Sequence, residues 1–181
     1  KAHWLGGYEL MLQQAFVKWM KPGMVAYDIG ANIGYMSVLL ARIAGAEGQV
    51  FAFEALPKNI ARLQKNIDLN MCISPVKVVP NAVTDQPGEI SFFVHASTSM
   101  GKAAGSAGRE EEYLEEIVVP STSIDHFVYE QGNPAPDLKR RMGVGRHATV
   151  SRWRRDAPDC LSRSDRTSCF VSANTWRPLH S

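Results

Sequence analysis

The sequence lacks the features of several protein classes. It has no run of 18 apolar residues, so no membrane span is predicted. Its three cysteines form no Cys-x-x-Cys pair, which argues against a disulfide framework or a zinc site and favours a reducing, cytoplasmic location. The histidines are scattered, and none is spaced from cysteines or acids as metal ligands are, so we expect no metal.

An excess of charge of one sign is absent too. Twenty Lys and Arg residues face 18 Asp and Glu residues, which gives a net charge of +2 and no global attraction to nucleic acid or a membrane surface. The stretch Arg152-Trp-Arg-Arg155 resembles a nucleic-acid patch only superficially, so no nucleic-acid partner is expected. At 181 residues, the chain is long enough for one domain with a core.

Two apolar runs that each end in an acid are the most informative feature present. Val25 to Asp28 leads into a turn bracketed by Gly30 and Gly34, and Val50 to Phe53 leads into Glu54. Glycine lacks Cβ, so such a turn can approach a ligand closely. A carboxylate at the end of the second strand can accept hydrogen bonds from a ribose diol. This layout predicts a nucleoside-cofactor site in a doubly wound α/β sheet.

The rest of the pattern supports a mostly parallel sheet. Alternating strands and helices over residues 24–79 imply right-handed crossovers between parallel strands. We expect helices at 10–20, 34–44, 58–69 and 123–129, and strands at 24–28, 50–54, 76–79, 90–94 and 117–119. Residues 96–116 have few large apolar side chains and are predicted to form a loop.

The identity of the cofactor follows from the turn. A dinucleotide fingerprint needs Gly-x-Gly-x-x-Gly, but Asn32 and Tyr35 stand at its second and third glycine positions. Asp28, two residues before the first glycine, would repel a pyrophosphate and attract the ammonium and sulfonium of S-adenosylmethionine. The pattern therefore favours S-adenosylmethionine over NAD.

These motifs carry a resemblance to a known family. The runs that carry it are Asp28-Ile-Gly-Ala-Asn-Ile-Gly34, Phe53-Glu-Ala-Leu-Pro57, Asn66-Ile-Asp-Leu-Asn70, Asn81-Ala-Val-Thr-Asp85 and Ser123-Ile-Asp125. Together they resemble the FkbM family of S-adenosylmethionine-dependent methyltransferases over roughly residues 6–138. The resemblance implies a Rossmann-like class I methyltransferase fold. It also implies an enzyme that O-methylates a small-molecule, sugar or lipid hydroxyl.

The candidate cofactor-binding residues come from these motifs. Asn81 and Ala82 follow the third strand, where the resemblance places contacts to adenine, although Asn81 could equally be a plain turn residue. Tyr8 and Glu9 precede the first helix and could fold over the cofactor, or Glu9 could simply favour a helix N-terminus. No residue is assigned as the catalytic base. The predicted cofactor site comprises Asp28, Gly30, Ala31, Asn32, Gly34, Glu54, Asn81 and Ala82.

The chain departs from the family after Leu138. The family continues with a strand of the form Ile-Lys-Ile-Asp-Val-Glu-Gly, whereas Lys139-Arg-Arg-Met142 is not typical of a buried strand. We therefore predict a partial methyltransferase domain over residues 1–138 and an Arg-rich tail over 139–181 that lacks the next strand. A reading-frame shift is our hypothesis for this change. The sheet would then be incomplete on its C-terminal side, with an unpaired inner edge.

Two other interpretations stay open at this stage. One is a catalytically impaired fragment that binds the cofactor without transferring a methyl group. The other is an NAD(P)-binding oxidoreductase, against which the two missing glycines argue.

Overall fold

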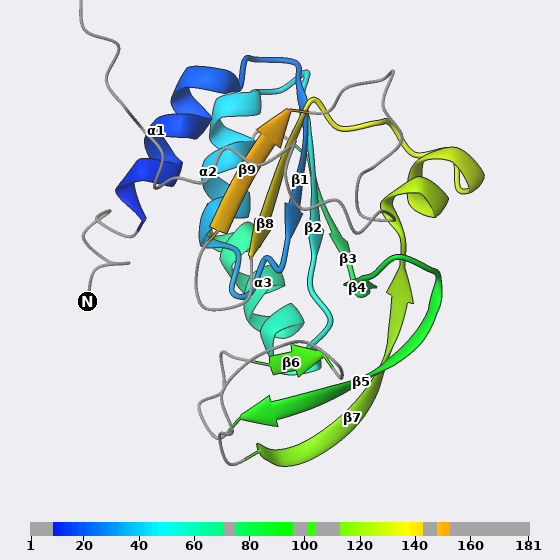
Figure 1. Ribbon diagram of the computed structural model, residues 1–181. Helices are drawn as coiled ribbons and strands as arrows, with labels where there is room; N and C mark the ends of the chain where they lie inside the picture. The colour runs from blue at the N-terminus through cyan, green and yellow to red at the C-terminus, as the bar shows by residue number, and fades with distance from the viewer. Residues whose placement is uncertain (1–8, 71–74, 96–100, 104–112, 143–147, 153–181) are drawn as a thin grey trace, which may run out of the picture.

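The main sheet of the protein is mostly parallel. The computed structural model describes residues 9–70, 75–95, 101–103, 113–142 and 148–152. Within these residues a five-stranded sheet has the order β3-β2-β1-β8-β9, in which β9 alone runs antiparallel to its neighbour (Figure 1). Its strands are β1 (Val25–Ile29), β2 (Gln49–Phe53), β3 (Val76–Val79), β8 (Leu138–Met142) and β9 (Ala148–Arg152).

Helices cover one face of this sheet. They are α1 (Leu10–Trp19), α2 (Tyr35–Ala44) and α3 (Pro57–Asn70), close to the expected bounds. The helical spacing of Leu12 and Phe16 places both side chains in the core with Leu40 and Val50. The expected β-α-β-α-β order is therefore confirmed. None of the helices in the described residues has the length and apolarity that crossing a membrane requires.

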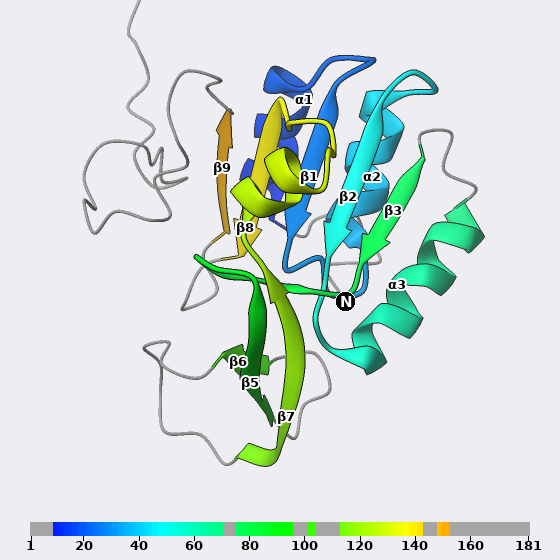
Figure 2. The ribbon, with the colours of Figure 1, turned by 90° about the vertical axis from the view of Figure 1, so that its right-hand side faces the viewer.

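An aromatic cluster fills the opposite face of the sheet. Tyr27, Phe51 and Phe53 pack against Phe127, with ring centroids 5.7, 5.3 and 5.0 Å from the Phe127 ring. Phe127 lies on η1 (His126–Glu130), the short helix expected over residues 123–129, which crosses in front of the strands in Figure 2. The two faces of the central strands thus pack against different elements, as alternation along a strand requires.

A second sheet extends beyond the carboxyl ends of β1 to β3. Its strand order is β4-β7-β5-β6. Both views show the long antiparallel pair β5 and β7 below the main sheet (Figures 1 and 2). The expected strands at 90–94 and 117–119 are present but longer. The loop prediction was wrong in part, because β6 and the start of β7 lie within residues 96–116 and pair with β5. The strands are β4 (Ala82–Val83), β5 (Gly88–His95), β6 (Gly101–Ala103) and β7 (Tyr113–Thr122).

The prediction that no strand follows Leu138 is wrong. Strand β8 runs from Leu138 to Met142, pairs in parallel with β1 and in turn pairs with β9. The inner edge of the sheet is therefore occupied, and strands continue across residue 138, where we expected the domain to end. Backbone pairing tolerates the Lys-Arg-Arg run because Leu138 and Arg140 alternate inward while Arg141 is exposed. Residues 153–181 of the predicted tail lie outside the described residues.

Candidate cofactor-binding site

The turn between β1 and α2 is held in an unusual backbone conformation. Gly30, Asn32 and Gly34 have φ values of 75, 54 and 87°, in the left-handed region that favours glycine. The backbone N–H groups of Gly30 and Ala31 both donate to the carbonyl of Phe53, each at 2.9 Å. These bonds fix the turn against the carboxyl end of β2, where ligands bind in open α/β sheets.

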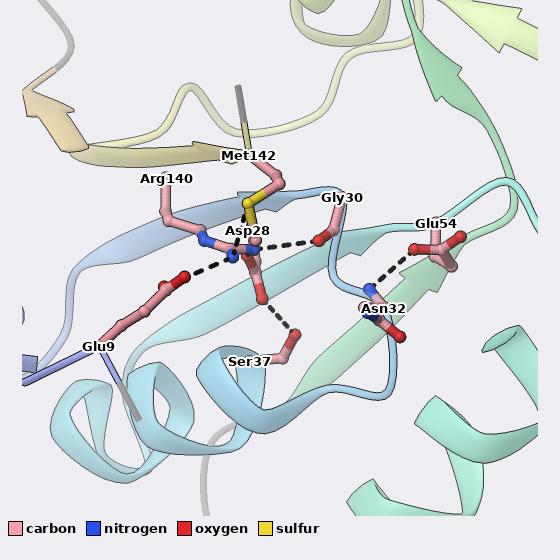
Figure 3. A network of polar contacts seen from close by, with 8 residues as sticks. All are labelled: Glu9, Asp28, Gly30, Asn32, Ser37, Glu54, Arg140 and Met142. Atoms are coloured by element: carbon pink, nitrogen blue, oxygen red, sulfur yellow. Dashed lines mark hydrogen bonds and ion pairs between the residues drawn. The ribbon is translucent and has the colours of Figure 1, made fainter. Parts of the chain in front are cut away.

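Glu54 anchors the same turn through its side chain. Its Oε2 accepts a hydrogen bond of 2.7 Å from the backbone N–H of Asn32 (Figure 3). Its Oε1 accepts from the Leu56 N–H at 3.0 Å and from the Asn59 amide at 3.4 Å. Glu54 is buried, so these donors stabilise its charge. These hydrogen bonds bring together the predicted site residues Gly30, Ala31, Asn32 and Glu54.

Helix α3 presses against the end of the turn. A Cβ atom added at Gly34 would collide with Cδ1 of Leu63, which is fully buried in α3. One turn further along the helix, the Asn66 amide donates a 2.7 Å hydrogen bond to the carbonyl of Ile33. Gly34 is therefore required both for its positive φ and for the close approach of the helix.

Asp28 lies at the centre of a buried polar network. Its side chain has no exposed surface. Oδ2 accepts a 2.6 Å hydrogen bond from the Ser37 hydroxyl of α2, and Oδ1 forms a 2.8 Å ion pair with Arg140 of β8 (Figure 3). Both oxygens therefore have partners from neighbouring elements, and the carboxylate joins β1, α2 and β8.

Arg140 is the site residue that sequence reasoning missed. It stands directly opposite Asp28 in the register of β1 and β8 and is 2% exposed. Besides Asp28, its guanidinium donates to the Gly30 carbonyl at 3.0 Å and lies 4.0 Å from Glu9 Oε2. The period-two alternation of Leu138, Arg140 and Met142 could have signalled a strand, but the charge of Lys139 to Arg141 obscured it.

The remaining candidates lie at the same edge of the sheet. Asn81 and Ala82 follow β3 directly, and the Asn81 N–H donates to the Val79 carbonyl at 2.8 Å. Ala82 packs with Ala55, the residue after Glu54, in a small apolar cluster. Tyr8, which the sequence offers with Glu9 as a residue over the cofactor, lies outside the described residues.

The fold and this edge define a Rossmann-like α/β domain with a glycine-bracketed turn and an acid at the next strand end. A family model described as the methyltransferase FkbM domain matches residues 28–138, more than half of the chain. The chain therefore belongs to the FkbM methyltransferase domain family. The family match argues against the alternative of an NAD(P)-binding oxidoreductase.

Other similar proteins match over shorter stretches. Protein-L-isoaspartate O-methyltransferases 1 and 2 of Arabidopsis thaliana are 36% and 34% identical over 58 residues, which is 32% of this chain. The match spans 25% and 19% of their respective lengths. A solved putative rRNA methylase of Clostridium thermocellum is 24% identical, covers 39% of this chain and 40% of its own, and has a TM-score of 0.38. The fold assignment rests on the sheet topology of this chain rather than on that superposition.

Proposed function

We propose that this protein is an S-adenosylmethionine-dependent O-methyltransferase. The observation that carries the proposal is the turn from Gly30 to Gly34, which lies at the carboxyl edge of a parallel sheet and is held by Glu54. Family membership supports methyl transfer, and the names of both Arabidopsis relatives support an oxygen acceptor. S-adenosylmethionine supplies an activated methyl group on a sulfonium.

The residues of the site have the chemistry that a nucleoside needs. Each oxygen of a carboxylate has more than one acceptor position. Oε1 of Glu54 already accepts from Leu56 and Asn59, but Oε2 can accept from a ribose hydroxyl while it holds the Asn32 N–H. Gly30 and Gly34 let the turn adopt positive φ angles while Met142 and Leu63 pack against it, so its backbone lies at the edge of the sheet. Ala31, Asn81 and Ala82 are proposed to line the nucleoside side of the site, and Asp28 to favour the cationic end.

The acceptor is proposed to be a small-molecule, sugar or lipid hydroxyl. The antiparallel pair β5 and β7 extends past the edge of the main sheet at which the turn lies (Figures 1 and 2). This placement favours entry of the acceptor on that side. Alignment of the acceptor with the methyl group would supply about 7–11 kcal/mol of the barrier reduction. We further propose a cytoplasmic location, because the sequence has three cysteines and no Cys-x-x-Cys pair.

Calorimetric titration with S-adenosylhomocysteine tests the proposal. We expect saturable binding to one site in the wild type and loss of binding in Glu54→Ala, because the ribose acceptor and the anchor of the turn are removed together. Glu54→Gln should retain part of the binding, since its amide oxygen can still accept one of these bonds.

The matched control is Asp68→Ala, which removes the same charge from an exposed position of α3. Its affinity should equal that of the wild type. Absence of S-adenosylhomocysteine binding in the folded wild type and also in a folded variant that lacks the Arg140 guanidinium would overturn the proposal. Binding without methyl transfer to any hydroxyl acceptor would support the alternative of a cofactor-binding fragment.

A further inference from the structure

The guanidinium of Arg140 makes polar contacts on several sides. It contacts Asp28 Oδ1 at 2.8 Å and the Gly30 carbonyl at 3.0 Å, lies 4.0 Å from Glu9 Oε2, and reaches the Met142 sulfur at 3.9 Å (Figure 3). Two of these groups, Asp28 and Gly30, were assigned to the cofactor site from the sequence. Arg140 therefore occupies hydrogen-bond acceptors on two residues, Asp28 and Gly30, that are proposed to bind the cofactor.

The charges around Arg140 do not cancel. Among the described residues two carboxylates, Asp28 and Glu9, face one guanidinium, so these three side chains carry a net negative charge. The Glu9 Oε2 atom is buried and has no hydrogen-bond partner among the described residues. A cluster of this composition attracts a further cation more readily than an anion. The cationic ammonium or sulfonium of the proposed cofactor fits that requirement.

The carboxylate of Asp28 is closed to a ligand as long as Arg140 keeps its place. Asp28 has no exposed surface, and Arg140 and Ser37 take one carboxylate oxygen each. The spare acceptor positions of these oxygens are closed off by burial, so a ligand cation can contact the Oδ1 atom only where Arg140 gives way. Arg140 is anchored on a neighbouring strand and has a long side chain, so it can leave without breaking the backbone of the turn.

We propose, as an extension of the proposed function, that Arg140 is an internal competitor for the cationic end of the cofactor. Its guanidinium stands where the ligand cation would stand, and cofactor binding requires it to leave Asp28 and the Gly30 carbonyl. The apparent affinity then equals the intrinsic affinity multiplied by the fraction of molecules in which Arg140 is displaced. Arg140 thus sets the affinity of the site and keeps the turn ordered when no ligand is bound.

The test is titration of Arg140→Met with S-adenosylhomocysteine, which carries the same ammonium group. Methionine keeps an apolar side chain of similar length but has no positive charge. If Arg140 is displaced in a few per cent or less of wild-type molecules, Arg140→Met should bind S-adenosylhomocysteine roughly tenfold tighter or more. A role in structure alone would weaken binding instead. The matched control is Arg141→Met on the exposed side of β8, which should leave the affinity unchanged.

Two further variants keep the test decisive. Should Arg140→Met lose its cooperative unfolding transition, Arg140→Lys decides, because a single ammonium cannot replace both Nη1, which contacts Asp28 and the Gly30 carbonyl, and Nη2, which lies near Glu9. It should bind more tightly than the wild type, by less than Arg140→Met. The double variant Asp28→Asn with Arg140→Met should lose the gain in affinity. Retention of the gain in that double variant would overturn the inference.

The inference and the proposed function fail in different ways. A wild type that binds S-adenosylhomocysteine, together with folded Arg140 variants that bind no tighter, overturns the inference alone. Absence of binding in the wild type and in every folded Arg140 variant overturns the proposed function as well. Binding in Arg140→Met without detectable binding in the wild type supports both.

Discussion

Leu63 of α3 packs against Gly34 so closely that a methyl group at position 34 would overlap its Cδ1 atom. Gly34 also has a φ of 87°, which L side chains rarely adopt. We expect Gly34→Ala to lower the free energy of unfolding by about 1–3 kcal/mol for the backbone conformation, with a similar amount for the overlap. Urea unfolding monitored by circular dichroism measures the change.

The matched control for that variant is Gly23→Ala. Gly23 has a φ of 83°, but a Cβ at this position would have nothing within 4 Å. It should therefore show the conformational cost without the overlap. Equal losses in the two variants would show that Leu63 moves away from the added methyl group at no cost in stability.

Asp28 is expected to be the most sensitive acid in the described part of the chain. Asp28→Asn removes the nearer carboxylate partner of the buried Arg140 guanidinium and leaves only Glu9, 4.0 Å away. Breaking a buried ion pair in this way costs about 3–5 kcal/mol. Asp85→Asn, at an exposed turn position, should change the stability by less than about 0.5 kcal/mol. Chemical denaturation of both variants compares them, and similar stabilities would contradict the buried pairing.

The phenol of Tyr27 is expected to make stability depend on pH in the alkaline range. Burial raises its pKa well above the ordinary value, and its hydroxyl donates a 2.7 Å hydrogen bond to the Pro134 carbonyl. Because the folded state holds the proton more tightly, this stabilisation is fully present below about pH 10, the unfolded value, and is lost as the pH rises above it.

Tyr27→Phe tests this expectation. It should lower the free energy of unfolding by about 0.5–1.5 kcal/mol at neutral pH, the usual net value of a hydrogen bond. Between pH values on either side of 10, the free energy of unfolding should also fall less steeply for the variant than for the wild type. An identical alkaline decline in both proteins would count against the protonated, buried phenol.

Phe127 is expected to hold η1 against the sheet. Its ring contacts those of Tyr27, Phe51 and Phe53 and is 6% exposed. Phe127→Ala should lower the free energy of unfolding by about 3–5 kcal/mol because it leaves a cavity among the rings. Tyr129→Ala is the control on the same helix, since Tyr129 is 65% exposed. Thermal unfolding compares the two, and a small loss in Phe127→Ala would show that η1 contributes little to the core.

Part of the site could be predicted because its signals are local. The turn from Gly30 to Gly34 needs positive φ angles, which its glycines and asparagine supply. Glu54 ends an apolar run, so its place at a strand end follows from the pattern. What the pattern could not give is the partner of each group: that Glu54 holds the Asn32 N–H, or that Leu63 requires glycine at position 34, depends on how α3 packs.

The sequence by itself determined the β-α-β-α-β order of residues 24–79 and the family, because apolar period and turn residues act over short distances. Only the tertiary structure decided that Leu138–Met142 is a strand. The edge of β1 offers hydrogen bonds to the backbone of any residue. By local criteria Arg140 is a poor strand residue because of its charge, but it pairs with the carboxylate of Asp28, which lies 112 positions earlier in the chain.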